Sequence, residues 1–173
     1  MSPVAHTALG IFGWRLFADS RNRKTLTLFI IIASLPDIDF ALFFLYGKAG
    51  PGMHQLYTHN VFFVFITALF FSPLFKTGKE RFGFFLVAFS HLGLDFLTID
   101  GAAPFGFRMF YPLWEKHFNL GILPNLWKAN LGDVFSIHNV LVVGFEILLF
   151  WVPLMLIYKW YNKLNWENIY DNC

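Results

Sequence analysis

Charged residues and cysteine are both scarce in this 173-residue chain. Asp, Glu, Lys and Arg make up 14% of the residues, against about 25% in an ordinary soluble domain. The one cysteine, Cys173, excludes an internal disulfide. The Lys and Arg residues form no dense basic cluster, which argues against a nucleic-acid partner, and neither an internal repeat nor a low-complexity tract is visible.

What the chain has instead is apolar residues, at 57% of the sequence, with 24 phenylalanines. This composition predicts an integral membrane protein, and the length suits a single domain over residues 1–173. We expect an all-α fold, a polytopic helical bundle of about four or five spans. The first segment has no positive residue before Arg15 and no convincing small-residue cleavage site, so we expect a retained helix rather than a signal peptide.

Apolar runs separated by polar, Gly or Pro punctuation mark the expected helices. The long connection before the last span, Asp100 to Ser136, is expected to be extracytoplasmic, and the tail from Lys159 suits a helix lying at the membrane interface. The expected helices are Pro3–Phe17, Leu26–Tyr46 (interrupted at Pro36), Asn60–Phe75, Phe82–Ile99 and Ile137–Tyr158.

The distribution of Lys and Arg over the connections predicts the orientation, because the cytoplasmic side carries the excess. The N-terminus should therefore face away from the cytoplasm. One side carries nine of the 13 basic residues, namely Arg15, Arg21, Arg23, Lys24, Lys76, Lys79, Arg81, Lys159 and Lys163; the other carries Lys48, Arg108, Lys116 and Lys128.

Two ionisable residues, His91 and Asp95, lie inside the apolar run 82–99. Four residues apart on a helix, they share one face and could bind one ion. An ionised group at that depth costs about 3 kcal/mol or more unless it has a partner, so a functional site is the first hypothesis. The alternative is an interior hydrogen-bonded pair that joins helices.

Other histidines and acids fall in the same, non-cytoplasmic half of the predicted bundle. Side chains on facing helices build the sites of helical bundles, so these groups predict one convergent metal site. The set comprises His6, Asp37, Asp39, His54, His59, Asp95, Asp133 and His138.

Asp37 and Asp39 lie about 200° apart on a continuous helix and cannot both face one site there. If the helix breaks before Pro36, both carboxylates can be presented from distorted backbone. Otherwise one binds the ion and the other orients a histidine ligand.

His54 and His59 are five residues apart, so His54 is expected in the Gly-rich loop, with Thr58 capping the third helix and His59 in its first turn. His138 has the simpler reading of a polar helix start. Glu146 could form a structural bridge to an interior His or Arg, or belong to the metal site.

The series of motifs resembles a family, the membrane-bound metal-dependent hydrolases of the YdjM type. Its pattern is an early His, LPDxD, HRGxTHS, and HLLLDxxT followed by Gly and a WPF-like turn. Here these read as His6, LPDID at 35–39, HQLYTHN at 54–60, HLGLDFLT at 91–98, Gly101, and YPL at 111–113. Gln55 replaces the family's Arg and Asn60 its Ser, so substrate preference is expected to differ. The zinc-dependent phospholipase C and P1 nuclease group is a remoter resemblance.

The resemblance implies a bacterial inner-membrane hydrolase that acts through a metal-activated water. Imidazole and carboxylate ligands suit zinc, or manganese or iron, and their number suits two or more ions. We expect the substrate to be a phosphoester of a lipid or lipid-linked molecule. The expected metal ligands are His6, Asp37, Asp39, His54, His59, His91 and Asp95, with Asp39 also as the proton acceptor.

Two other functions stay open on the sequence. Transporters also place ion sites on broken helices within the membrane, so the chain could conduct metal ions or protons. It could also be an inactive relative that keeps a metal for stability. The apolar cytoplasmic halves of the expected helices favour the hydrolase.

Overall fold

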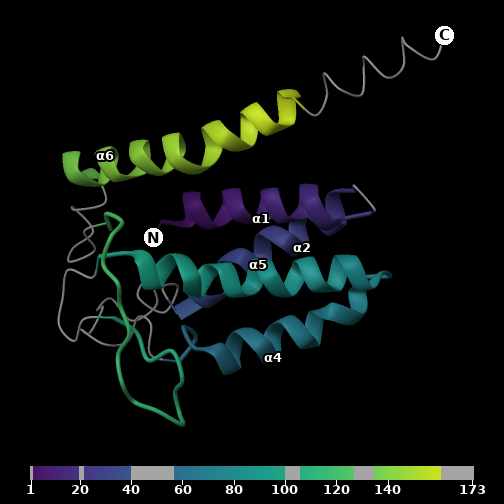
Figure 1. Cartoon of the computed structure of the whole chain (residues 1–173), viewed down its shortest axis with the longest axis horizontal. Helices are drawn as coiled ribbons and strands as arrows, with labels where there is room; N and C mark the ends of the chain where they lie inside the picture. The colour runs from purple at the N-terminus through teal and green to yellow at the C-terminus, as the bar shows by residue number, and fades with distance from the viewer. Residues whose placement is uncertain (1, 20–21, 40–56, 100–105, 127–134, 161–173) are drawn as a thin grey trace.

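A computed structural model describes residues 2–19, 22–39, 57–99, 106–126 and 135–160. The described chain is all-helical, as predicted, apart from two isolated bridges, and it has no sheet (Figure 1). The α-helices are α1 (Pro3–Phe17), α2 (Arg23–Ser34), α4 (Val61–Phe71), α5 (Gly78–Leu97) and α6 (Ile137–Glu146). Two 3-10 turns, η1 (Leu35–Asp37) and η2 (Ser72–Leu74), follow α2 and α4, and the π-helical turn η4 (Ile147–Trp151) continues α6.

Each of these α-helices begins at a side-chain cap. An oxygen of the capping residue accepts a hydrogen bond from a backbone N–H in the first turn, which the helix itself leaves without a partner. The caps are Ser2, Asn22, Asn60, Thr77 and Ser136.

Helix α5 lies at the centre of the bundle and packs against α1, α2 and α4. Small residues let α1 approach closely: a Cβ on Gly10 would lie 2.9 Å from the Ile30 Cα, and one on Gly13 would clash with Val87. Such small residues allow close helix packing where lipid gives no hydrophobic drive between helices. The distance between α1 and its neighbours is thus set by glycine.

Aromatic rings fill the centre of the bundle. Phe29, Phe75 and Phe84 are each 1% exposed or less, with ring centroids 4.6 to 5.6 Å apart. Their tilted and edge-on arrangement is the favourable geometry for aromatic pairs. This apolar core separates the two ends of the bundle.

Residues 106–126 cross the end of the bundle where α5 finishes. The backbone N–H groups of Leu120 and Ile122 donate to the carbonyls of Phe96 and Leu97, which have no partner within the helix. The segment therefore closes the C-terminal end of α5.

The opposite end of α5 carries a polar junction. Glu80 is buried and accepts from the backbone N–H groups of Asp19 and Lys76. The Asp19 carboxylate accepts hydrogen bonds from the Thr77 hydroxyl and the Lys79 ammonium. These bonds, the Thr77 bond foremost, hold the pKa of the carboxyl below its usual range. Helix α5 begins at Gly78, four residues before the expected start at Phe82.

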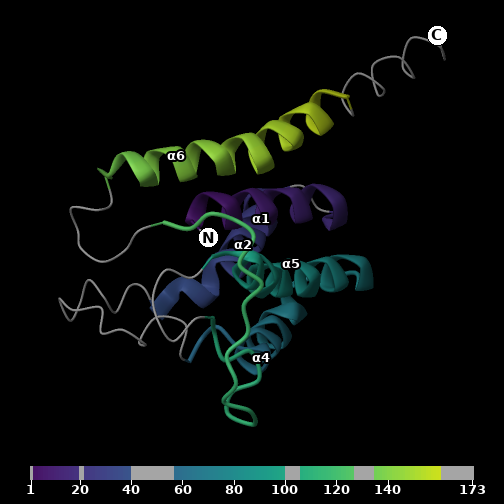
Figure 2. The ribbon, with the colours of Figure 1, turned by 60° about the vertical axis from the view of Figure 1, so that its left-hand side comes forward.

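Helix α6 lies against α1, with α4 on the opposite side of α5 in both views (Figures 1 and 2). It is fastened to the start of α1 by two contacts. The Trp151 indole donates to the Val4 carbonyl at 3.1 Å, and the Ser2 backbone N–H and hydroxyl donate to the two oxygens of Glu146. Glu146 is fully buried, and its described partner is a serine rather than the expected His or Arg.

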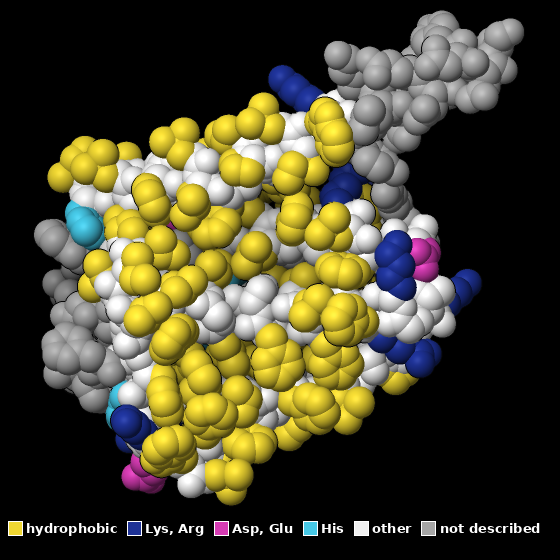
Figure 3. Space-filling view, viewed as in Figure 1, with side chains coloured by type: hydrophobic (Ala, Val, Ile, Leu, Met, Phe, Trp, Pro, Cys, Tyr) yellow, Lys and Arg dark blue, Asp and Glu magenta, His cyan; other side chains and the backbone are white. Residues whose placement is uncertain are grey.

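Hydrophobic side chains cover most of the surface shown in Figure 3, whereas Lys and Arg gather mainly at the end where α5 begins. On α4 and α6 the exposed fractions reach 76% at Phe70 and 75% at Ile137. Large exposed apolar surfaces mark contact with protein or membrane.

Among the described residues, one helix, Ile137–Trp160, is long and apolar enough to cross a membrane, and Val61–Leu74 is a shorter apolar helix. The expected four or five spans are not confirmed. The 15 residues of α1 extend about 22 Å, less than the roughly 30 Å of a bilayer core. The expected second helix ends at Ser34, and residues 40–46 and the tail from 161 lie outside the described residues.

Candidate metal centre

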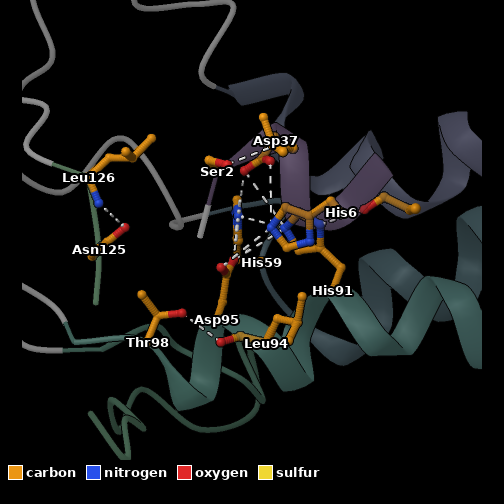
Figure 4. A network of polar contacts seen from close by, with 12 residues as sticks. Ser2, His6, Asp37, His59, His91, Leu94, Asp95, Thr98, Asn125 and Leu126 are labelled. Carbon is orange, nitrogen blue, oxygen red and sulfur yellow. Dashed lines mark hydrogen bonds and ion pairs between the residues drawn. The ribbon is translucent and has the colours of Figure 1, made fainter. Parts of the chain in front are cut away.

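Five side chains from four segments meet at the end of the bundle that is closed by residues 106–126 (Figure 4). His6 comes from α1, Asp37 from η1, His59 from the residue before the cap of α4, and His91 and Asp95 from α5. His6, His59 and His91 are 0% exposed and Asp95 is 4% exposed. The convergence expected from the sequence is therefore present for these five residues.

Local sequence explains how two of the segments reach this point. Helix α2 ends at Ser34, and Pro36 enters a 3-10 turn that carries Asp37. Proline suits the first turn of a helix because its missing N–H needs no partner there. His91 and Asp95 share one face of α5, as their spacing predicts.

His59 is held by the start of α4. The Asn60 side chain caps this helix by accepting from the Phe63 N–H at 2.8 Å, so the expectation that Thr58 is the cap is wrong. The Val61 N–H donates to the Met109 carbonyl, which ties α4 to the segment 106–126. These two hydrogen bonds fix the start of α4, and with it the position of the His59 imidazole.

Four of these residues present one atom each toward a common centre. From His59 Nε2, the distances are 3.2 Å to His91 Nε2, 3.4 Å to Asp37 Oδ1 and 3.3 Å to Asp95 Oδ2. From His91 Nε2 they are 3.7 Å to Asp37 Oδ1 and 3.2 Å to Asp95 Oδ2. A tetrahedral ion with bonds of about 2.0–2.1 Å needs ligands about 3.4 Å apart. These five distances are close to that value, all four atoms lie within 4.8 Å of one another, and they could hold a metal ion.

A hydrogen bond from His91 Nδ1 determines the tautomer of this ring, and so whether the Nε2 that faces the centre is an acceptor. His91 Nδ1 lies 2.7 Å from the Ala33 carbonyl oxygen, and only an N–H can donate to a carbonyl. The neutral ring therefore carries its proton on Nδ1. Its Nε2 lone pair points at the cluster, as a metal ligand requires.

His59 is oriented in the same way by Thr58 and Asp39. The Thr58 hydroxyl donates its proton to Asp39 Oδ2 at 2.9 Å. The contacts of His59 Nδ1, at 3.3 Å to Asp39 Oδ2 and 3.2 Å to Thr58 Oγ1, then require the proton to come from His59. Its Nε2 is also an acceptor when the ring is neutral, so all four inward atoms are acceptors and a cation suits them.

His6 lies beside this group rather than within it. Its ring stacks on His91 with centroids 3.8 Å apart and an interplanar angle of 16°. Both of its ring nitrogens are buried without a hydrogen-bond partner in the described part of the chain, and so is Asp37 Oδ2. Buried polar atoms are normally paired, and orphaned ones at a cluster point to a ligand.

The remaining sequence candidates lie elsewhere. Asp39 contacts the outer side of His59 instead of the centre. His138 Nε2 is 2.8 Å from the Asn125 carbonyl oxygen, and Glu146 binds Ser2. His54 and Asp133 fall outside the described residues.

Two supporting groups were not expected from the sequence. Ala33 contributes only its carbonyl, which no side-chain pattern marks. Phe107 is 1% exposed and lies edge-on to the His59 ring at 6.5 Å. Gly106, at φ +87°, allows that placement because a Cβ there would clash with the Phe118 carbonyl.

The fold and the cluster define the class: an all-helical protein with a large apolar surface and a buried His/Asp group that could hold a metal ion. A family model described as YdjM inner membrane protein matches residues 1–166, and the chain belongs to this family. No curated protein and no solved structure matches the chain. The remoter resemblance to the zinc-dependent phospholipase C and P1 nuclease group stays a prediction.

Proposed function

We propose that this protein is a membrane-embedded, metal-dependent hydrolase that cleaves a phosphoester of a lipid or lipid-linked substrate. The observation that carries the proposal is the set of four converging acceptor atoms, with five of their six separations at 3.2 to 3.7 Å and all within 4.8 Å. A divalent ion held by these four atoms that took a water as a fifth ligand would lower the pKa of that water and offset charge on a phosphoester. Imidazole with carboxylate in a tetrahedron favours zinc.

The roles of the chain's own residues follow from their contacts. His59, His91, Asp37 and Asp95 would hold the ion. Asp39 would hold His59 in the orientation that keeps its Nε2 lone pair inward, which favours the second of the two arrangements considered for the Asp37–Asp39 pair. The further expectation that Asp39 accepts a proton from the attacking water stays a prediction.

Access to the centre favours approach from the side of Asp37. Its side chain is 17% exposed, whereas that of Asp95 is 2% exposed and the histidines are 0% exposed. A carboxylate ligand at the open edge leaves room for water and substrate beside the ion. The large apolar surface of the bundle favours a substrate that is reached from the lipid phase.

Arg108 offers a cation for an anionic substrate. Its Nε is buried without a hydrogen-bond partner among the described residues, and it follows Phe107, which lies against His59. Guanidinium groups bind phosphate through paired N–H donors. Arg108 could therefore supply the cation that the family pattern has at position 55, where this chain has glutamine.

The core below the site argues against transport. An ion path to the basic end of the bundle would pass Phe29, Phe84 and Val87, which are 5% exposed or less and belong to one hydrophobic cluster. Crossing it would strip an ion of polar partners at large cost. Because the basic residues gather at the opposite end (Figure 3), we propose that the site faces the non-cytoplasmic side.

The test is hydrolysis by the purified protein in lipid nanodiscs. Panels of phospholipids and isoprenoid phosphates are incubated with protein loaded with Zn²⁺, Mn²⁺ or Fe²⁺, and released phosphate or headgroup is measured. We expect metal-dependent release that chelation abolishes and that Asp95→Asn reduces at least 100-fold. Asp19→Asn, at the opposite end of α5, is the matched control and should keep full activity.

Two results would refute the proposal. If metal-loaded protein releases no product from either panel, hydrolysis of these lipid substrates is excluded. Uptake of the ion into proteoliposomes, again without hydrolysis, would establish the transporter in its place.

A further inference from the structure

We infer that the centre holds two metal ions, and that His6 binds the second ion together with the outer oxygens of Asp37 and Asp95. This inference rests on the proposed function and adds a ligand set that the four-atom group leaves out. It is carried by the way in which the two carboxylates are shared between His6 and the other histidines.

Each carboxylate turns a different oxygen to each side. Asp37 Oδ1 and Asp95 Oδ2 face His59 and His91, at 3.2 to 3.7 Å. Asp37 Oδ2 and Asp95 Oδ1 face His6 Nε2, at 3.9 and 3.7 Å. This is how carboxylates are arranged when they bridge two ions, one oxygen to each. Neither contact of His6 is short enough for a hydrogen bond, which leaves room for an ion between them.

The stacked rings set the spacing of the two ions. The centroids of His6 and His91 are 3.8 Å apart and the rings are nearly parallel, at 16°. Two parallel rings that each point Nε2 at an ion place the ions about as far apart as the rings. Ions in two-metal hydrolytic sites lie about 3.5 to 4 Å apart. The stack would hold two imidazoles at that spacing.

The burial of His6 supports the same conclusion. Its ring is 0% exposed, and neither nitrogen has a hydrogen-bond partner in the described chain. An imidazole kept only for packing would carry two unsatisfied polar atoms, where a phenyl ring would carry none. Three protein ligands on the second ion would leave its further positions for water and substrate, as in open catalytic sites.

The experiment counts ions in the full-length protein. Protein purified in detergent is stripped with a chelator, reloaded with Zn²⁺, desalted and submitted to elemental analysis. We expect two ions per chain in the wild type and in the control His117→Ala. We expect one ion in His6→Ala and in His6→Phe, in which a flat ring can still stack on His91.

A second readout reports whether the ions are neighbours. In protein loaded with Mn²⁺, two ions bridged by carboxylates couple magnetically, so the wild type should give the multiline electron paramagnetic resonance spectrum of a coupled pair. Both His6 variants should give the six-line signal of isolated Mn²⁺. A wild-type spectrum of isolated ions would overturn the shared-carboxylate arrangement.

The outcomes separate this inference from the proposed function. One ion in the wild type, or two in the His6 variants, overturns the second ion but leaves a one-ion centre intact. Loss of both ions from a His6 variant that stays folded by circular dichroism also overturns the assignment of His6 to one ion. No ion in the wild type overturns both proposals together.

Discussion

Replacing Asp95 by asparagine should make the stability of the protein insensitive to metal. Asn has the same shape as Asp, but it carries no charge and offers an N–H donor. Asp95 Oδ2 lies 3.3 and 3.2 Å from Nε2 of His59 and His91, so an amide could donate to either nitrogen. In the variant, hydrogen bonds should therefore pair buried atoms of the cluster. In the wild type, the proposed ion would take that place.

The magnitude follows from the spacing of the charges. The ligand atoms of Asp37 and Asp95 lie within 4.8 Å of each other, which at an effective dielectric constant of about 20 corresponds to a repulsion of about 3 kcal/mol. In chelator, Asp95→Asn should thus unfold at the same temperature as the wild type or at a higher one.

With bound metal, the wild type should unfold at a higher temperature than Asp95→Asn. An ion at 100 times its Kd stabilises the folded state by about 2.7 kcal/mol, which in a chain of this length raises the Tm by about 5 to 10 °C. The assay is thermal unfolding in detergent, followed by tryptophan fluorescence with Zn²⁺ or with chelator, and Asp19→Asn is the control. An equal rise for wild type and Asp95→Asn would refute the reasoning. So would a loss of stability in chelator, since Asp95 would then be a structural residue.

Three further predictions test other parts of the structure. Asp39→Asn weakens the acceptor that orients His59, so metal affinity by titration should fall about 10- to 100-fold, and an unchanged affinity would exclude the orienting role. Gly10→Ala should cost about 1 to 3 kcal/mol, because its Cβ would press on the α2 backbone. Gly93→Ala, with open space around it, should cost less than about 0.5 kcal/mol in the same denaturation assay. The pKa of Asp19 is lowered in the fold, so its stabilisation is present above about pH 4 and is lost as the pH falls through the folded-state value; a denaturation series that falls equally for Asp19→Asn would contradict this.

The parts of the site that the sequence predicted are those with a local signal. The spacing of His91 and Asp95 determines that they share a face of one helix, and Pro36 marks where α2 must end. Both follow from helix geometry and backbone sterics alone. The alternating direction of the predicted helices then groups their histidines and aspartates at one end of the bundle, although it does not say which atom faces which.

The errors occurred where the choice depends on tertiary contacts. Thr58 and Asn60 are both good caps; in the structure Asn60 caps α4, and the Thr58 hydroxyl donates to Asp39 instead. The pairing of Ser2 with Glu146 joins residues 144 positions apart and has no local signal. The start of α5 is similar, since its first turn is stabilised from another segment through Glu80.

Asn60 stands where the family pattern has serine. Because Asn60 caps α4 next to His59, this difference affects the surroundings of the candidate metal centre. Asn and Ser are nearly equal as N-caps, so the change keeps the start of α4, and with it the position of His59. The cap also donates from its amide to the Tyr57 carbonyl at 2.7 Å, a bond that a serine hydroxyl is too short to match from the same position. This holds residues 57–60 as one turn, with Thr58 directed at Asp39. The substitution therefore removes a hydroxyl from the region of the candidate site while the cap keeps His59 in place, so it alters the surroundings of the His/Asp cluster and leaves the cluster itself unchanged.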